Sequence, residues 1–197
     1  MRPSPHTRPE YVAAFREIIN RIAASLEGLP KRALPIRMFV AGGAALHFYT
    51  GERVSQDIDA AFSRRIALPD DLDVHYRDAD GAARLLYFDR QYSDTLGLMH
   101  EDAYDDSVPL TLKGIDSKVL EVRLLTPLDL AVSKLGRFAS QDRDDIAQLA
   151  RRKLITATAL RRRAEDALKG YVGDTARAQG SIDLACRIIA DVQARKP

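Results

Sequence analysis

Two aspartates spaced two residues apart, Asp57 and Asp59, form the pattern in this sequence that most directly points to chemistry. They open the segment DIDAAF, which predicts a strand over 57–62. In a strand, residues i and i+2 point to the same face, so the two carboxylates would lie side by side. Adjacent carboxylates repel each other unless a cation lies between them. Such hard oxygen ligands suit Mg²⁺ or Mn²⁺. The pair predicts a divalent metal site, although an isolated Asp-x-Asp also occurs at solvated strand ends.

A glycine pair, Gly42 and Gly43, precedes the aspartates by about a dozen residues. It follows the apolar run IRMFVA, which predicts a buried strand over 36–41, and it precedes AALHFYT, which predicts a short helix ending at Gly51. Backbone N–H groups at a glycine turn beside a helix N-terminus can approach phosphate oxygens that a side chain would obstruct. A glycine pair alone is most often only a tight turn. Combined with the aspartates, it predicts a metal–triphosphate site.

The order and spacing of these two features resemble the nucleotidyltransferases of the polymerase-β superfamily, in which a GG or GS turn precedes a D-x-D strand. Arg53 and Ser55, in the segment Arg-Val-Ser-Gln before the aspartates, match the lead-in of the small members. The resemblance implies that Asp57 and Asp59 are catalytic metal ligands. It also implies nucleotide-binding roles for Gly42, Gly43, Arg53 and Ser55.

A second region, residues 125–150, resembles the AbiEii-like toxin nucleotidyltransferases, in which a lysine on a helix precedes an acidic helix start. Lys134 matches the lysine, and Asp142 and Asp145 match the acids. The resemblance implies catalytic roles for Lys134 and Asp145 and a nucleotide-binding role for Asp142. An ammonium group among apolar neighbours could neutralise a triphosphate. The alternative is that Lys134 extends to solvent and Asp142 only caps its helix.

Polymerase-β-type enzymes usually carry a third carboxylate on a strand beside the D-x-D strand, and this sequence offers no unambiguous one. Glu121, within KVLEVRLL, is the best candidate for a third metal ligand because strand alternation places it in a sheet. The alternative is an ion pair between Glu121 and Arg123. Asp102, Asp105 and Asp106, in a predicted loop, are rival candidates.

The activity that the resemblance implies is a metal-dependent transfer of a nucleoside monophosphate from an NTP to an acceptor. The acceptor could be an RNA, such as tRNA, or a protein, and the setting could be a toxin–antitoxin or phage-defence pair with a cognate partner protein. A second hypothesis is an inactive module that keeps the fold and binds a nucleotide, RNA or partner. A D-x-D glycosyltransferase is disfavoured because those enzymes need a longer segment before the D-x-D than the 56 residues present.

The elements that position these residues indicate an α+β protein. Apolar residues at steps of three and four predict an amphipathic helix over 11–27. Short extended segments between 64 and 125 predict antiparallel strands, and helical spacing prevails after Thr126, whose Thr-Pro pair predicts a helix start. We expect a small mixed-sheet, polymerase-β-like nucleotidyltransferase core with flanking helices over 1–125. A helical C-terminal segment over 126–197 would pack on it.

Composition excludes several classes of protein. Hydrophobic residues make up 46% and charged residues 29%, as in soluble globular proteins, and no apolar run approaches the roughly 18 residues of a spanning helix. The polar start resembles no secretory signal, so we expect a cytoplasmic protein. The single cysteine, Cys186, excludes an internal disulfide. Residues 151–197 carry 11 Lys and Arg against 5 Asp and Glu, which predicts either phosphate contacts or a solvated basic helix face.

Overall fold

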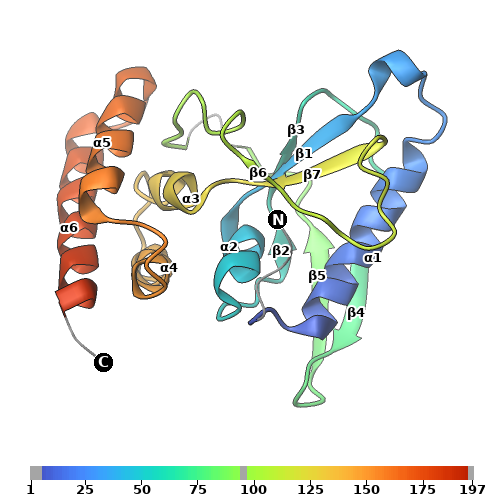
Figure 1. Ribbon diagram of the computed structural model, residues 1–197, viewed down its shortest axis with the longest axis horizontal. Helices are drawn as coiled ribbons and strands as arrows, with labels where there is room; N and C mark the ends of the chain where they lie inside the picture. The colour runs from blue at the N-terminus through green and yellow to red at the C-terminus, as the bar shows by residue number, and fades with distance from the viewer. Residues whose placement is uncertain (1–5, 94–96, 195–197) are drawn as a thin grey trace. The chain divides into compact units, whose positions relative to one another are not determined.

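The computed structural model describes residues 6–93 and 97–194. The chain separates into two compact units (Figure 1). The first comprises Met1–Tyr92 and Ser107–Leu124, and the second comprises Ser93–Asp106 and Leu125–Pro197. The expected division after residue 125 differs from this one chiefly in the segment 93–106, which belongs to the helical unit.

The first unit combines helices with short strands, which confirms the predicted α+β class. Its elements are α1 (Pro9–Ser25), η1 (Lys31–Ala33), β1 (Ile36–Val40), α2 (Gly42–Thr50), β2 (Asp57–Ile58), β3 (Ala60–Phe62), β4 (Asp73–Arg77), β5 (Ala83–Phe88), β6 (Val108–Pro109) and β7 (Leu120–Leu124). The strand expected over 36–41 is present as β1, and the helix expected after the glycine pair is present as α2 but begins at Gly42, so that the pair forms its first two residues.

The strands form two small sheets rather than one. The first has the order β3-β1-β7-β6, with β1 and β7 parallel and both edge strands antiparallel to their neighbours. The second has the order β2-β5-β4, with β2 parallel to β5 and β4 antiparallel to β5. Both sheets are mixed. The strands within 64–125 pair with one another antiparallel, as expected, β4 with β5 and β6 with β7. Strands β5 and β7 each also have a parallel neighbour from earlier in the chain.

The segment predicted as one strand over 57–62 divides between these sheets. Ile58 is the last residue paired with β5, and Ala60 is the first paired with β1. The carbonyl of Asp59 still accepts a hydrogen bond from the Ala41 amide at 2.8 Å. Asp59 therefore lies at the point where the chain passes from one sheet to the other, beside the start of α2.

Helix α1 supplies much of the core of this unit. Its apolar stripe is buried and the helix packs against β4 and β5. The ring of Phe15 meets that of Phe48 on α2 edge to face, with centroids 4.8 Å apart. Because burying a large side chain stabilises a fold by about 1.5–3 kcal/mol, this stripe fixes α1 and α2 relative to the strands.

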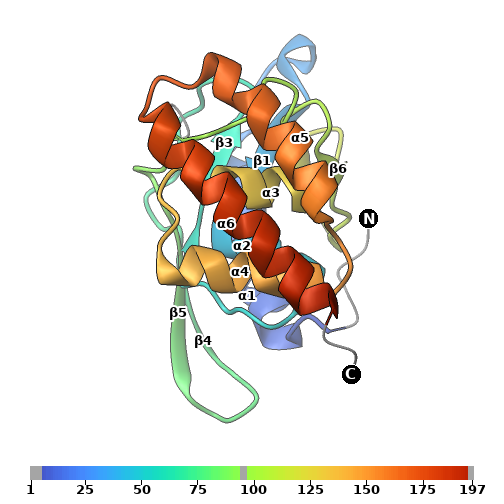
Figure 2. The same cartoon turned by 90° about the vertical axis from the view of Figure 1, so that its left-hand side faces the viewer.

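The second unit is helical, with a short segment from earlier in the chain. Its elements are α3 (Pro127–Ser133), α4 (Ser140–Arg151), α5 (Ala157–Ala167), η2 (Leu168–Gly170) and α6 (Thr175–Ala194). As the Thr-Pro pair predicts, Thr126 caps α3 by accepting a hydrogen bond from the Asp129 amide at 3.0 Å. Helix α6 packs against α4 and α5 (Figure 2). No helix among the described residues is long and apolar enough to cross a membrane.

Candidate active site

The glycine turn and the two aspartates meet in space. Gly42 follows β1 and begins α2 with a φ of +57°, a conformation that favours glycine. A Cβ atom built on Gly42 would lie 1.9 Å from Oδ2 of Asp59. One on Gly43 would lie 2.7 Å from Oγ of Ser55. Any residue other than glycine at these two positions would place its Cβ atom against the side chains of Asp59 and Ser55. The close approach of the turn therefore requires glycine.

The lead-in segment completes the cluster. Ser55 is buried, and its hydroxyl donates a hydrogen bond to Oδ1 of Asp57. The guanidinium carbon of Arg53 lies 3.0 Å from the Cβ position of Gly43. The structure thus brings together six residues that the first motif predicts: Gly42, Gly43, Arg53, Ser55, Asp57 and Asp59.

The chemistry of this cluster fits a divalent cation and a phosphate group. Asp57 and Asp59 are half-buried while Ile58 between them is fully buried, so two carboxylates lie on the face opposite the core. Ala41 at the N-cap of α2 has no side-chain cap, which leaves the first-turn amides to meet an anion. Among the described residues, no three His, Cys, Asp or Glu side chains converge as a metal site. The two aspartates are therefore the predicted metal ligands that the structure places together.

Glu121 does not join the aspartates. On β7 it pairs in register with Arg37, whereas the Asp59 carbonyl accepts a hydrogen bond from the amide of Ala41, four residues further along the chain and just beyond the end of β1. That offset is about 13 Å along the strand. The Glu121 carboxylate instead forms ion pairs with Arg123 at 2.6 Å and Arg37 at 3.3 Å. The interpretation of Glu121 as a third metal ligand is not supported, and the alternative, an ion pair with Arg123, is present.

An acid that the sequence patterns missed, Asp89, lies next to the cluster. Ile58 pairs with Phe88 in parallel register, and the Asp89 amide donates to the Ile58 carbonyl at 3.1 Å. The backbone of Asp89 therefore lies beside the peptide that joins Ile58 to Asp59, while its carboxylate accepts from the Gln91 amide at 2.8 Å. The available signal was an acid directly after the apolar run LLYF. The sequence does not show that the strand before Asp89 pairs with a strand 30 residues earlier in the chain.

The acids of the second motif surround a lysine within the helical unit. Lys134, 6% exposed, places Nζ 2.6 Å from Oδ2 of Asp145 and 3.7 Å from Oδ1 of Asp142. Asp142 also accepts from the Ala139 amide at 2.9 Å, which caps α4, and from Arg137 at 2.9 and 2.8 Å. Burial acts to raise the pKa of Asp142, but the Arg137 and Ala139 hydrogen bonds outweigh it and lower the pKa. The structure brings Lys134, Asp142 and Asp145 together as a buried ion network.

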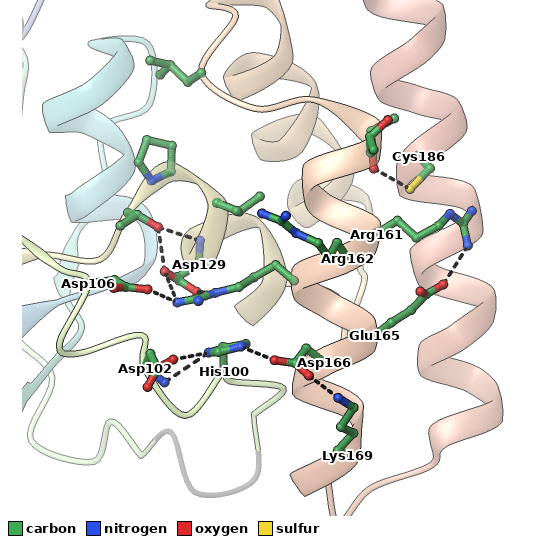
Figure 3. A pocket seen from close by; sticks show the side chains of 17 residues that line it. His100, Asp102, Asp106, Asp129, Arg161, Arg162, Glu165, Asp166, Lys169 and Cys186 are labelled. Carbon is green, nitrogen blue, oxygen red and sulfur yellow. Dashed lines mark hydrogen bonds and ion pairs between the residues drawn. The ribbon is translucent and has the colours of Figure 1, made fainter.

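The rival acids Asp102 and Asp106 belong to the helical unit, around a groove of about 1380 Å³ (Figure 3). Arg163 bridges Asp129 at 2.8 Å and Asp106 at 2.7 Å, and His100 contacts Asp166 at 2.7 Å. These pairs tie the segment before residue 107 to α3 and α5. They also neutralise part of the basic C-terminal region, since its Arg163 faces two carboxylates.

A buried histidine, His47, holds the backbone of the lead-in segment at Arg53. His47 on α2 is fully buried, and its Nδ1 contacts the Arg53 carbonyl at 2.5 Å while its Nε2 accepts from the Arg8 amide at 3.1 Å. These partners require the neutral tautomer with a proton on Nδ1. Burial lowers the pKa of His47, an effect larger than the opposing one of the Arg53 carbonyl.

Stability is therefore expected to fall as the pH drops below about 6.5, because the unfolded chain takes up a proton that the folded His47 resists. The slope contributed by this group can reach about 1.4 kcal/mol per pH unit. Urea unfolding at pH 7.5, 6.5 and 5.5 measures it. His47→Asn should flatten the dependence, and His75→Asn on β4 should not. An unchanged slope in His47→Asn would refute this assignment.

Comparison with known proteins assigns the chain to a family. Residues 17–181 match the family described as "Nucleotidyltransferase of unknown function (DUF6036)". No curated protein and no solved structure matches the chain. The matched range includes the glycine turn, both aspartates and the Lys134 network. The chain belongs to this nucleotidyltransferase family.

Proposed function

We propose that this chain is a metal-dependent nucleotidyltransferase of the polymerase-β type that moves a nucleoside monophosphate from an NTP to an acceptor. The observation that carries the proposal is the direct approach of the Gly42 turn to Asp59. It joins an amide-lined phosphate cradle to a pair of hard oxygen ligands, which is the combination that a metal-bound triphosphate requires.

Each residue of the cluster has a role in this proposal. Asp57 and Asp59 would hold Mg²⁺ or Mn²⁺, and Ser55 would orient Asp57 through its hydrogen bond. Amides of the glycine turn would donate to phosphate oxygens, and Arg53 would add positive charge. A bound divalent cation would polarise the α-phosphate and neutralise charge on the leaving group. The acceptor hydroxyl would lose its proton to solvent and bond to the α-phosphorus as the bond to the departing pyrophosphate breaks.

The roles that the family resemblance implies for Lys134, Asp142 and Asp145 stay predictions. Within the helical unit, Asp145 lies 2.6 Å from the Lys134 ammonium, so removing either charge would leave the other buried without its nearest partner.

An RNA acceptor is supported by a second feature of the first unit. A pocket of about 260 Å³ lies beside β3 and the end of β5, and its lining includes Arg64, Arg65 and Arg90. Phe62 and Phe88, whose ring centroids are 5.8 Å apart, also line it. Arginines pair with phosphates, and the half-buried Phe62 ring can stack on a base while the buried Phe88 ring supports it from the core. This lining therefore suits a nucleic-acid strand better than a protein hydroxyl.

The inactive binding module is the second candidate, and one observation favours it. In the part of the chain that the structure describes, no third carboxylate converges with Asp57 and Asp59. That candidate predicts nucleotide or RNA binding without product. The toxin–antitoxin setting, with a cognate partner protein, is supported by the resemblance of residues 125–150 to AbiEii-like toxins.

The test is incubation of the purified chain with each α-labelled NTP, Mg²⁺ or Mn²⁺, and cell lysate that contains RNA. We expect label in a product that ribonuclease destroys and protease does not. Label that protease removes would replace the RNA acceptor with a protein. Retained nucleotide binding without any labelled product would favour the inactive module.

A further inference from the structure

Tyr87 on β5 is an exposed aromatic side chain beside a predicted metal ligand. It pairs in parallel register with Asp57, and residues in register on neighbouring strands point to the same face, about 4.8 Å apart. The Tyr87 side chain is 40% exposed, whereas Leu86 and Phe88 on either side of it are buried. The ring therefore lies on the solvent face of the sheet, next to the Asp57 side chain.

The glycine turn and β5 flank the two aspartates on opposite sides. Successive carbonyls of an extended segment point to opposite edges. The Ile58 carbonyl accepts from the Asp89 amide of the chain leaving β5, at 3.1 Å. The next carbonyl, that of Asp59, accepts at 2.8 Å from the amide of Ala41, the residue before the glycine turn. The phosphate cradle thus lies across the aspartate segment from β5.

This arrangement gives the two substrates of the proposed reaction separate sides of the site. The acceptor hydroxyl attacks the α-phosphorus from the side opposite the departing pyrophosphate, because the attacking and leaving oxygens lie in line. With the outer phosphates of the NTP on the glycine turn, the acceptor approaches from the side of β5. The exposed ring on that side is Tyr87, two residues before the Asp89 that lines the arginine-containing pocket.

Charge on this face determines which part of an RNA can contact the ring. On its other side Tyr87 pairs with the exposed Asp73 on β4. The Asp73 carboxylate repels phosphate groups, whereas an uncharged base can stack on a tyrosine ring. The exposed Arg64 and Arg65, in the pocket beside the end of β5, can pair with phosphates instead. The ring therefore suits a base, and the pocket suits the backbone that leads to it.

We propose that the base of the terminal nucleotide of the acceptor RNA stacks on Tyr87, which positions the terminal ribose hydroxyl beside Asp57 and Asp59. The inference deepens the proposed function and rests on it, because it requires an RNA acceptor. It specifies the acceptor as a strand whose terminal nucleotide is unpaired. Tyr87 is a positioning residue for that nucleotide and takes no part in metal binding.

The experiment measures binding of a short single-stranded RNA with a fluorescent 5′ end, by anisotropy, with Mg²⁺ and a non-hydrolysable α,β-methylene NTP present. A second RNA is identical except that its 3′-terminal nucleotide lacks the base. Both are tested on the full-length wild type, Tyr87→Ala and Tyr87→Phe. The matched control is His75→Ala, which removes another exposed side chain from the same face of the sheet. Transfer of α-label to RNA is measured in parallel, with Asp57→Asn as its control.

We expect Tyr87→Ala to bind the complete RNA about tenfold more weakly, because stacking of a base on an aromatic ring contributes at least that much. Removing the terminal base should weaken wild-type binding by a similar factor and leave binding to Tyr87→Ala unchanged, since both changes remove the same contact. Tyr87→Phe keeps the ring and should bind like the wild type, as should His75→Ala. In the transfer assay, Tyr87→Ala should raise the KM for RNA and leave the KM for NTP unchanged.

Equal discrimination against the base-free RNA by the wild type and Tyr87→Ala would overturn the inference, because the base would then contact another residue. Weakening by Tyr87→Phe as large as that by Tyr87→Ala would also overturn it, since the hydroxyl rather than the ring would be responsible. So would failure of the wild type to bind either RNA. In each of these cases, Asp57-dependent transfer of label to RNA would leave the proposed function intact.

The transfer assay identifies failure of the proposed function itself. Label on protein rather than RNA would overturn both the RNA acceptor and the role of Tyr87. Absence of transfer, with RNA binding that still depends on Tyr87 and the terminal base, would overturn the proposed activity and with it the positioning of an acceptor hydroxyl.

Discussion

Replacing Gly42 by Ala is expected to lower nucleotide transfer by at least about 10³-fold and to destabilise the chain by about 2–4 kcal/mol. The residue has a φ of +57°, which costs a side chain about 1–2 kcal/mol. Its new Cβ would lie 1.9 Å from Oδ2 and 2.9 Å from Cγ of Asp59. Relieving this clash requires movement of a predicted metal ligand or of the phosphate-binding turn, and either movement disrupts the site.

A second glycine serves as a control that separates the conformational cost of a positive φ from the clash with Asp59. Gly81, in the turn between β4 and β5, has a φ of +77° and no atom within 4 Å of its Cβ position. Gly81→Ala should therefore cost only the conformational term of about 1–2 kcal/mol and leave transfer unchanged. Urea unfolding and the transfer assay on both variants measure the contrast. Equal activity in Gly42→Ala and Gly81→Ala would show that the turn does not form part of the site.

Removing the Asp145 carboxylate should destabilise the chain by about 3–5 kcal/mol. Asp145 and Lys134 are 1% and 6% exposed and lie 2.6 Å apart. Asp145→Ala leaves an ammonium buried without its nearest counter-charge. Urea unfolding measures the loss. The exposed pair of Lys169 and Asp166, at 2.5 Å, is the control, and Lys169→Met should cost less than about 1 kcal/mol.

The double variant Lys134→Met/Asp145→Leu separates stability from chemistry. Because it removes both charges and keeps apolar volume, it should recover most of the stability that Asp145→Ala loses. If the Lys134 charge takes part in transfer, the folded double variant should remain at least about 10²-fold less active than the wild type. Full activity in a stable double variant would restrict Lys134 to a structural role.

Local features of this fold could be predicted from the sequence because short-range patterns determine them. The apolar stripe of α1, the strand before the glycine pair and the Thr126 cap each depend on residues within one or two helical turns or one strand. That the glycine pair and the two aspartates share one site was predicted from their combination and from the family resemblance, and the close approach of Gly42 to Asp59 agrees with it. A strand, a tight turn and a nearby strand leave few alternative arrangements.

Features that depend on pairing between distant segments could not be predicted. Alternation shows which face Glu121 occupies, but not that its partner on β1 is Arg37 rather than a residue near Ala41. The position of Asp89 could not be predicted for the same reason, because its proximity to Asp59 arises from the parallel pairing of β2 with β5. Likewise, nothing local showed that the strand over 57–62 divides between two sheets.

The most direct test of the central claim is transfer from NTPs labelled at either the α- or the γ-phosphate, with Mg²⁺ or Mn²⁺ and total RNA. The reaction proposed here transfers the α-label and releases the γ-label in pyrophosphate. Asp57→Asn and Asp59→Asn, with unchanged urea midpoints, should each lower transfer by at least about 10³-fold because each removes a metal ligand. Transfer of the γ-label, or undiminished α-label transfer in either variant, would contradict the assignment of Asp57 and Asp59 as the catalytic metal ligands.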